Sequence, residues 1–218
     1  MLSVSDSKEA QVSHSEKAYQ LIKEQIITLG LKPLAVIDEQ VLMSSLHLGR
    51  TPIREALHRL ATEDLVIIAP RRGMFVADIS ITDLQKIFEL RIQIEGYCAQ
   101  LAAQRASDAQ IAQMEEVVNR LEQVPSSATE ELMHIDQCLH QLMYDSANNK
   151  FLSDVLNRLH ALSMRLWYLA VDKLDDLKGS IEDHRRIVEA LKAGNGAQAE
   201  TLIQQHIFHF QQQIRAAL

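Results

Sequence analysis

The sequence is poor in the residues that interrupt helices. Only 7 of its 218 residues are glycine and only 4 are proline. Three of the prolines, Pro33, Pro52 and Pro70, lie before residue 79, and Pro125 alone follows. Because glycine and proline are the strongest local breaks in secondary structure, residues 79–218 are predicted to be almost entirely helical.

The sequence also lacks the marks of a secreted or membrane-spanning protein. Two cysteines, Cys98 and Cys138, form no disulfide framework, which is typical of a reducing compartment. No apolar run approaches the ~18–20 residues that a membrane span requires, and the N-terminus has no basic segment followed by an apolar one. We therefore expect a cytoplasmic protein without a membrane partner.

The charge is unevenly distributed along the chain. The formal net charge is −7, yet residues 47–77 contain five arginines against three acidic residues. A local basic patch on an acidic protein is compatible with DNA binding, because phosphate contacts act locally and charge is screened beyond ~10 Å. Charge alone does not decide between DNA binding and a solvated surface.

The first third of the chain has the pattern of three short helices and a hairpin. Residues 14–29 have helical apolar spacing, Asp38 is placed to cap a second helix, and Thr51 is placed to cap a third with Pro52 at its first position. Apolar runs at 65–69 and 74–77 flank a turn, which predicts a β-hairpin with a basic tip. This order predicts a winged helix-turn-helix; the alternative is a three-helix domain with a solvated charged face.

The segments LGRTPIREALHRL (48–60), EDLV (63–66) and RRGMFV (71–76) closely resemble the DNA-binding domain of GntR-family bacterial transcription regulators. Two positions depart from the family pattern: Gly49 replaces a Ser or Thr, and Leu34 replaces a Gly. The resemblance implies binding to double-stranded DNA at a palindromic operator. The residues expected to contact DNA are Arg50, Thr51, Pro52, Arg54, Arg59, Arg71, Arg72 and Gly73.

The remaining two thirds predict a second, all-helical domain. The expected helices are 81–105, 108–123, 129–147, 150–173, 178–193 and 196–217. Helices of this length predict one antiparallel six-helix bundle. The expected fold is therefore mainly α, with a winged-helix domain at 1–78 and a helical effector and dimerisation domain at 79–218.

Polar side chains occupy apolar stripes of three expected helices in that bundle. Asp136 and His140 are four residues apart on one stripe, while His184 and His206 lie on two later ones. A buried carboxylate costs several kcal/mol unless it is paired or metal-bound. These four residues therefore form either a divalent metal site or a hydrogen-bonded polar core. Imidazole and carboxylate ligands suit Zn²⁺, Ni²⁺ or Mn²⁺ and do not choose between them. Of the three, Zn²⁺ is the ion we expect, with Ni²⁺ and Mn²⁺ as alternatives.

Other polar residues of this domain are expected to be less involved. His134, His160 and His209 lack matching partners in the sequence and are not expected to be ligands. Cys138 is expected to lie in the core. Arg165 is a second candidate cation for an anionic effector, with a surface ion pair as the alternative.

The same positions resemble the metal-containing FCD effector domain of the FadR subfamily of GntR regulators, in the six-helix, VanR-like form. The resemblance implies that Asp136, His140, His184 and His206 hold the metal. Residues 88–95, FELRIQIE, resemble the first helix of that domain, whose arginine, here Arg91, faces the effector.

The expected function is that of a homodimeric, DNA-binding transcription regulator, not an enzyme. A small organic acid would bind at the metal, pair with Arg91 and change operator binding. One alternative is a metal sensor, in which the ion itself is the signal. A second alternative is a metallohydrolase that uses the same ligands; it leaves the DNA-binding segment unexplained.

Overall fold

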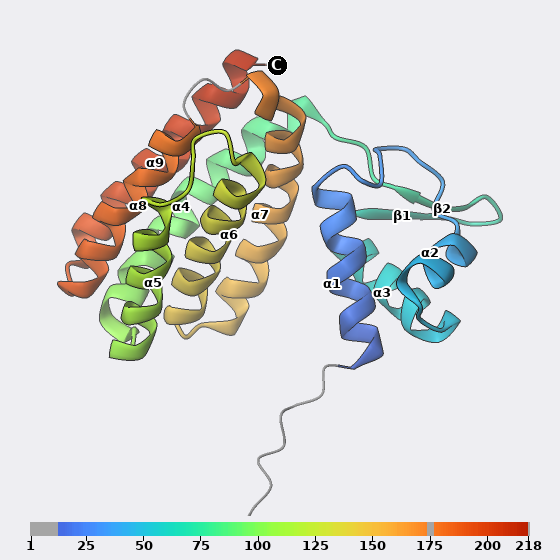
Figure 1. Ribbon diagram of the computed structural model, residues 1–218, viewed down its shortest axis with the longest axis horizontal. Helices are drawn as coiled ribbons and strands as arrows, with labels where there is room; N and C mark the ends of the chain where they lie inside the picture. The colour runs from blue at the N-terminus through green and yellow to red at the C-terminus, as the bar shows by residue number, and fades with distance from the viewer. Residues whose placement is uncertain (1–12, 174–176, 218) are drawn as a thin grey trace, which may run out of the picture. The chain divides into compact units, whose positions relative to one another are not determined.

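The computed structural model describes residues 13–173 and 177–217, and the chain divides into two compact units after Ile79 (Figure 1). Helices dominate both units, and two short strands belong to the first. None of the helices in the described residues is long and apolar enough to cross a membrane.

The first unit is a winged helix-turn-helix. Its elements are α1 (His14–Ile27), α2 (Glu39–Leu46), α3 (Arg50–Thr62), β1 (Val66–Ala69) and β2 (Gly73–Val76). The Ser13 hydroxyl accepts from the N–H of Glu16 at the start of α1, and the Asp38 carboxylate accepts from the N–H of Gln40 at the start of α2. These caps satisfy N–H groups that have no acceptor within the helix. Both α1 and α2 pack on α3.

Helix α3 begins earlier than the sequence predicts. Gly49 is its N-cap and makes no side-chain cap hydrogen bond, so Thr51 is not the cap and Pro52 is not the first helical residue. Pro52 is the third residue of the helix instead. The first-turn N–H groups of a helix have no intrahelical acceptor, so a proline there costs no hydrogen bond.

The hairpin forms the wing. Its strands pair antiparallel, with Val66 opposite Val76 and Ala69 opposite Gly73. Gly73 has φ +102°, a backbone conformation that residues other than glycine rarely adopt. The connector before α2 adds a β-bridge from Val36 to Phe75, which covers the free side of β2.

The second unit is a helical bundle. Within residues 80–173 and 177–217 its helices are α4 (Ile81–Arg105), α5 (Asp108–Leu121), α6 (Thr129–Ser146), α7 (Lys150–Ala170), the 3-10 turn η1 (Val171–Lys173), α8 (Leu177–Lys192) and α9 (Gly196–Ala217). The side chains of Ser80, Ser107 and Asn149 cap α4, α5 and α7. Helix α4 packs against α6, α7, α8 and α9 and is thus the centre of the bundle.

Candidate DNA interface and candidate metal centre

Two arginines stand exposed at the start of α3. Arg50 and Arg54 lie one helical turn apart, and each Nε is 3.3–3.4 Å from a different carboxylate oxygen of Glu39 in α2. Exposed ion pairs of this kind contribute about 0–1 kcal/mol. Exchanging Glu39 for a DNA phosphate or base edge would therefore cost little.

The wing presents a second exposed basic group. Arg71, Arg72 and Gly73 are all exposed at the turn between β1 and β2, and the N–H of Arg72 donates to the carbonyl of Ala69. That bond fixes the turn, so the two guanidinium groups project from a tight hairpin. DNA contacts by these residues and by the exposed Thr51 stay predictions.

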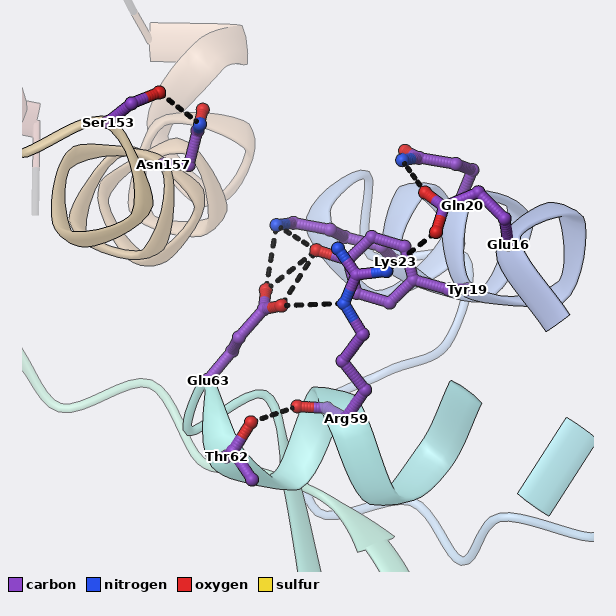
Figure 2. Close-up of polar contacts among 9 residues, drawn as sticks. All are labelled: Glu16, Tyr19, Gln20, Lys23, Arg59, Thr62, Glu63, Ser153 and Asn157. Atoms are coloured by element: carbon purple, nitrogen blue, oxygen red, sulfur yellow. Dashed lines mark hydrogen bonds and ion pairs between the residues drawn. The ribbon is translucent and has the colours of Figure 1, made fainter. Parts of the chain in front are cut away.

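Arg59, at the other end of α3, has partners inside its own unit (Figure 2). Its guanidinium carbon lies 3.5 Å from the ring centroid of Tyr19, and Nη1 is 2.7 Å from the Glu16 carboxylate. The Tyr19 hydroxyl and the Lys23 ammonium both donate to Glu63, at 2.7 Å. The predicted DNA contact of Arg59 is untested, and these contacts favour a role in fastening α1 to α3.

Four side chains from three helices converge in the core of the bundle. Asp136 and His140 come from α6, His184 from α8 and His206 from α9, and all four are buried. Their ligand atoms lie within 4.8 Å of one another. The Nε2 atoms of the three histidines are 3.7–3.9 Å from one oxygen, Oδ1 of Asp136. Tetrahedral Zn²⁺ ligands lie about 3.4 Å apart, so the contacts to Oδ1 are close to that spacing, and the wider pairs, up to 4.8 Å apart, would have to contract around an ion.

The hydrogen bonds of the imidazoles fit a metal. Nδ1 of His184 is 3.0 Å from the Ile181 carbonyl and must carry the proton to donate there. Its Nε2 atom is then an unprotonated acceptor, and it is buried without a hydrogen-bond partner among the described residues. Nδ1 of His140 lies 2.9 Å from Oε2 of Glu95. A buried acceptor without a donor is costly. A cation bound to Nε2 of His184 would remove that cost.

The charges of the cluster also fit a metal. Burial by itself raises the pKa of the Asp136 carboxyl, but His140, a hydrogen bond from His160 and the other two imidazoles together hold it well below its usual range. Burial lowers the pKa of His184 to about 4 and that of His206 well below its ordinary value. At neutral pH the site thus offers an ionised carboxylate and, from His184 and His206, neutral imidazoles, which are the forms that bind metals.

A fifth polar residue, which the sequence analysis set aside, adjoins the cluster. His160 of α7 is buried, its Nε2 is 3.8 Å from Oδ2 of Asp136, and its ring lies 4.8 Å from that of His140. Buried Leu156 and Met164, at four-residue spacing on either side, were the signal that His160 faces the core. His134 and His209 are exposed; that neither is a ligand stays a prediction.

A buried ion pair on α4, between Glu95 and Arg91, adjoins His140. Glu95 places Oε1 2.5 Å from Nε of Arg91, and Nη1 of Arg91 donates to the Ser163 hydroxyl. Glu95 was not among the residues expected at this site, although its position four residues after Arg91 is the spacing of a helical ion pair. Arg165 is buried too, so the alternative of a surface ion pair is wrong for it.

Cys138 is the other correction in this unit. It is half-buried, not part of the core, and its Sγ lies 3.5 Å from Nε2 of His134 on the outer side of α6. The apolar stripe of α6 continues through Leu139, one residue along. Cys98 is fully buried.

Comparison with known proteins covers both units. Residues 14–76 match the family described as bacterial regulatory proteins, gntR family, and residues 86–209 match the FCD domain. The chain is 24% identical to the HTH-type transcriptional repressor RspR of Escherichia coli, over 92% of this chain and 89% of that protein. Its fold is similar to E. coli McbR/YncC, with a TM-score of 0.83, 20% identity and coverage of 94% and 99%. A structure of the metal-free FCD domain of TM0439 covers 62% of this chain and 94% of its own, with a TM-score of 0.53 and 17% identity.

Proposed function

We propose that a small organic acid, held at a divalent metal ion, controls the operator binding of this protein. The chain belongs to the GntR family of bacterial regulatory proteins and carries an FCD domain. Membership of the family makes the chain a DNA-binding transcription regulator with an effector domain, and not a metallohydrolase. The metal ion, the organic acid, the palindromic operator and the homodimer go beyond family membership and are our proposals.

The metal proposal rests on one observation: three buried imidazoles converge on a single oxygen of a buried carboxylate. Asp136, His140, His184 and His206 would hold the ion, and Zn²⁺ is the proposed species, with Ni²⁺ or Mn²⁺ as alternatives. When bound, a divalent ion would supply positive charge and coordination positions for an anionic ligand. One carboxylate against a 2+ ion leaves a net charge of about +1, which favours an anion.

Two buried arginines are the proposed protein contacts of the acid. Arg91 lies on α4 and Arg165 on α7, and both are almost fully enclosed in the second unit. A guanidinium has five N–H donors, so Arg91 can serve Glu95, Ser163 and an effector carboxylate together. Buried cations recognise a carboxylate strongly because little water competes for it.

On the DNA side, Arg50 and Arg54 are proposed to read the major groove at the start of α3, while Arg71 and Arg72 contact the backbone beside it. Thr51, Pro52 and Gly73 would shape these two contact regions. An arginine that pairs bidentately with guanine contributes ~1–3 kcal/mol of specificity. Removing the guanidinium of Arg54 should therefore weaken specific binding by that amount.

A palindromic operator needs a two-fold protein, and the second unit has apolar side chains available for self-association. Phe151 is 82% exposed on α7, and Val155 lies one turn later on the same helix. Leu90 and Tyr97 are exposed two turns apart on α4, which packs against α7. We propose that a second copy of the chain covers these residues.

The metal assignment is tested by elemental analysis of full-length protein reloaded with Zn²⁺ or Ni²⁺ after purification without chelator. We expect close to one equivalent in the wild type, retention in His209→Ala and loss in His184→Ala. His209 is the matched control because it lies on α9 near His206 but is exposed. Less than about a tenth of an equivalent in the wild type would show that the four residues are a polar core.

A metal sensor is the alternative that this site also favours, because the ligands themselves could respond to the ion. Operator binding measured with and without chelator, in the absence of any organic acid, separates the two functions. We expect chelation to leave operator affinity little changed and the acid to change it only when metal is present. A large change on chelation alone would make the ion the signal.

A further inference from the structure

We propose that Glu95 is a positioning residue for the metal centre: it holds the His140 ring so that Nε2 faces Asp136. This inference deepens the proposed function and rests on its metal site. Glu95 belongs to α4 and contributes no ligand atom of its own to the cluster.

The contacts of Glu95 divide between two neighbours. Its side chain is fully buried, with Oε1 2.5 Å from Nε of Arg91 and Oε2 2.9 Å from Nδ1 of His140. The Tyr144 hydroxyl lies 3.3 Å from the same Nδ1. One carboxylate thus links a cation on its own helix to an imidazole on α6.

The 2.9 Å contact with Oε2 favours one tautomer of His140. A carboxylate accepts but does not donate hydrogen bonds, so it stabilises the form with the proton on Nδ1. The lone pair is then on Nε2, which is 3.8 Å from Oδ1 of Asp136 and on the side where the other imidazoles converge. Histidine ligands in metalloproteins commonly donate their second ring N–H to such an acceptor, which fixes the tautomer and increases ligand basicity.

His184 supplies an internal comparison. Its Nδ1 donates to a backbone carbonyl, that of Ile181, within its own helix. His140 instead has a full negative charge at that position, brought from a different helix. A carboxylate withdraws the Nδ1 proton more strongly than a neutral carbonyl does, so His140 should be the more strongly donating ligand of the two.

Arg91 explains how that charge is tolerated in the core. A buried carboxylate is unfavourable without a partner, and Arg91 provides both a cation and a second anchor, through its hydrogen bond to Ser163 of α7. An Arg–Glu pair needs no imidazole to be neutral. A purely structural Arg–Glu pair would therefore not require Oε2 of Glu95 to contact His140. The contact of Oε2 with Nδ1 of His140 is the feature that such a pair does not explain.

The experiment compares full-length wild-type protein with Glu95→Gln, Glu95→Asp and the double variant Glu95→Gln/Arg91→Gln. Glutamine keeps the size of the side chain but removes the charge, and the double variant removes both charges so that no unpaired arginine is buried. Zn²⁺ and Co²⁺ affinities are measured by competition with a chelating dye, and the visible spectrum of bound Co²⁺ reports ligand strength. Thermal unfolding of each metal-free protein shows whether it is folded.

We expect both glutamine variants to bind Zn²⁺ about 10- to 100-fold more weakly, with a shifted Co²⁺ spectrum, and Glu95→Asp to recover part of the loss. A folded double variant with wild-type affinity and spectrum would overturn the role of Glu95, because a purely structural ion pair predicts that result. Failure of the wild type to bind either ion would instead overturn the proposed metal site itself.

Discussion

Replacing Arg59 by alanine should destabilise the first unit while leaving the number of phosphate contacts unchanged. The cation–π contact with Tyr19, at 3.5 Å from the ring centroid, is worth about 0.5–1 kcal/mol at a partly exposed site. The Arg59 side chain is half exposed, so its ion pair with Glu16 adds about 0.2–1 kcal/mol. We expect a total loss of about 0.7–2 kcal/mol.

Hydrogen exchange in the full-length protein measures this loss, because the amides of α1 and α3 report on the first unit alone. Tryptophan fluorescence would not serve, since the single tryptophan, Trp167, lies in the second unit. Operator affinity is then measured at several salt concentrations. A lost phosphate contact reduces the slope of log K against log[salt] by about 0.9.

The salt slope separates a structural from a DNA-contacting role. If Arg59 fastens α1 to α3, Arg59→Ala lowers affinity with an unchanged slope, whereas Arg71→Ala, the control at the wing whose guanidinium is proposed to contact the DNA backbone, reduces it. A slope reduced by about one unit in Arg59→Ala, with unaltered exchange in α1, would refute our explanation and restore Arg59 to the DNA interface.

Three further predictions follow from other parts of the molecule. The double variant Arg50→Ala/Arg54→Ala should lose at least about 1–3 kcal/mol of specific operator binding in a titration; unchanged affinity would contradict the assignment of α3 to DNA. In the chelator-treated protein, burial lowers the pKa of His160 and His184 to about 4, against about 6.5 in an unfolded chain. The unfolded chain then binds more protons between pH 6.5 and 4, so stability should fall as the pH is lowered through this window; a thermal midpoint that stays level from pH 7 to pH 5 would be inconsistent with buried neutral imidazoles. Phe151→Glu should shift the protein from dimer to monomer in sedimentation at micromolar concentration, while an undisturbed dimer would place the interface elsewhere.

The fold was predictable because its signals are local. Few glycines and prolines, together with capping residues such as Ser80 and Ser107, determine where the helices of the second unit begin and end. The start of α3 was placed late because the sequence favours Thr51 as a cap. In the structure the backbone of Gly49 serves without a side-chain hydrogen bond, which no preference for polar caps reveals.

The site was predictable only in part. Asp136 and His140 could be paired from their spacing, because both lie on one helix. Glu95 and His160 reach the same cluster from α4 and α7, and their nearness depends on how helices distant in sequence pack together. Periodicity shows that a polar residue faces the core, but it does not show which residue of another helix lies opposite.

Helix α4, at the centre of the bundle, is continuous, so a small rotation about one of its residues becomes a larger displacement at its end. Ser80 follows the first unit directly in sequence, and Glu95 lies fifteen residues further along, so about 22 Å of uninterrupted helix separates them at 1.5 Å per residue. A tilt of about 5° pivoting at Glu95 would displace the start of the helix by about 2 Å, more than half of the ~3.4 Å rise between successive bases. A small rotation near Glu95 would thus reach Ser80, where the second unit begins, as a displacement comparable to the spacing of stacked bases.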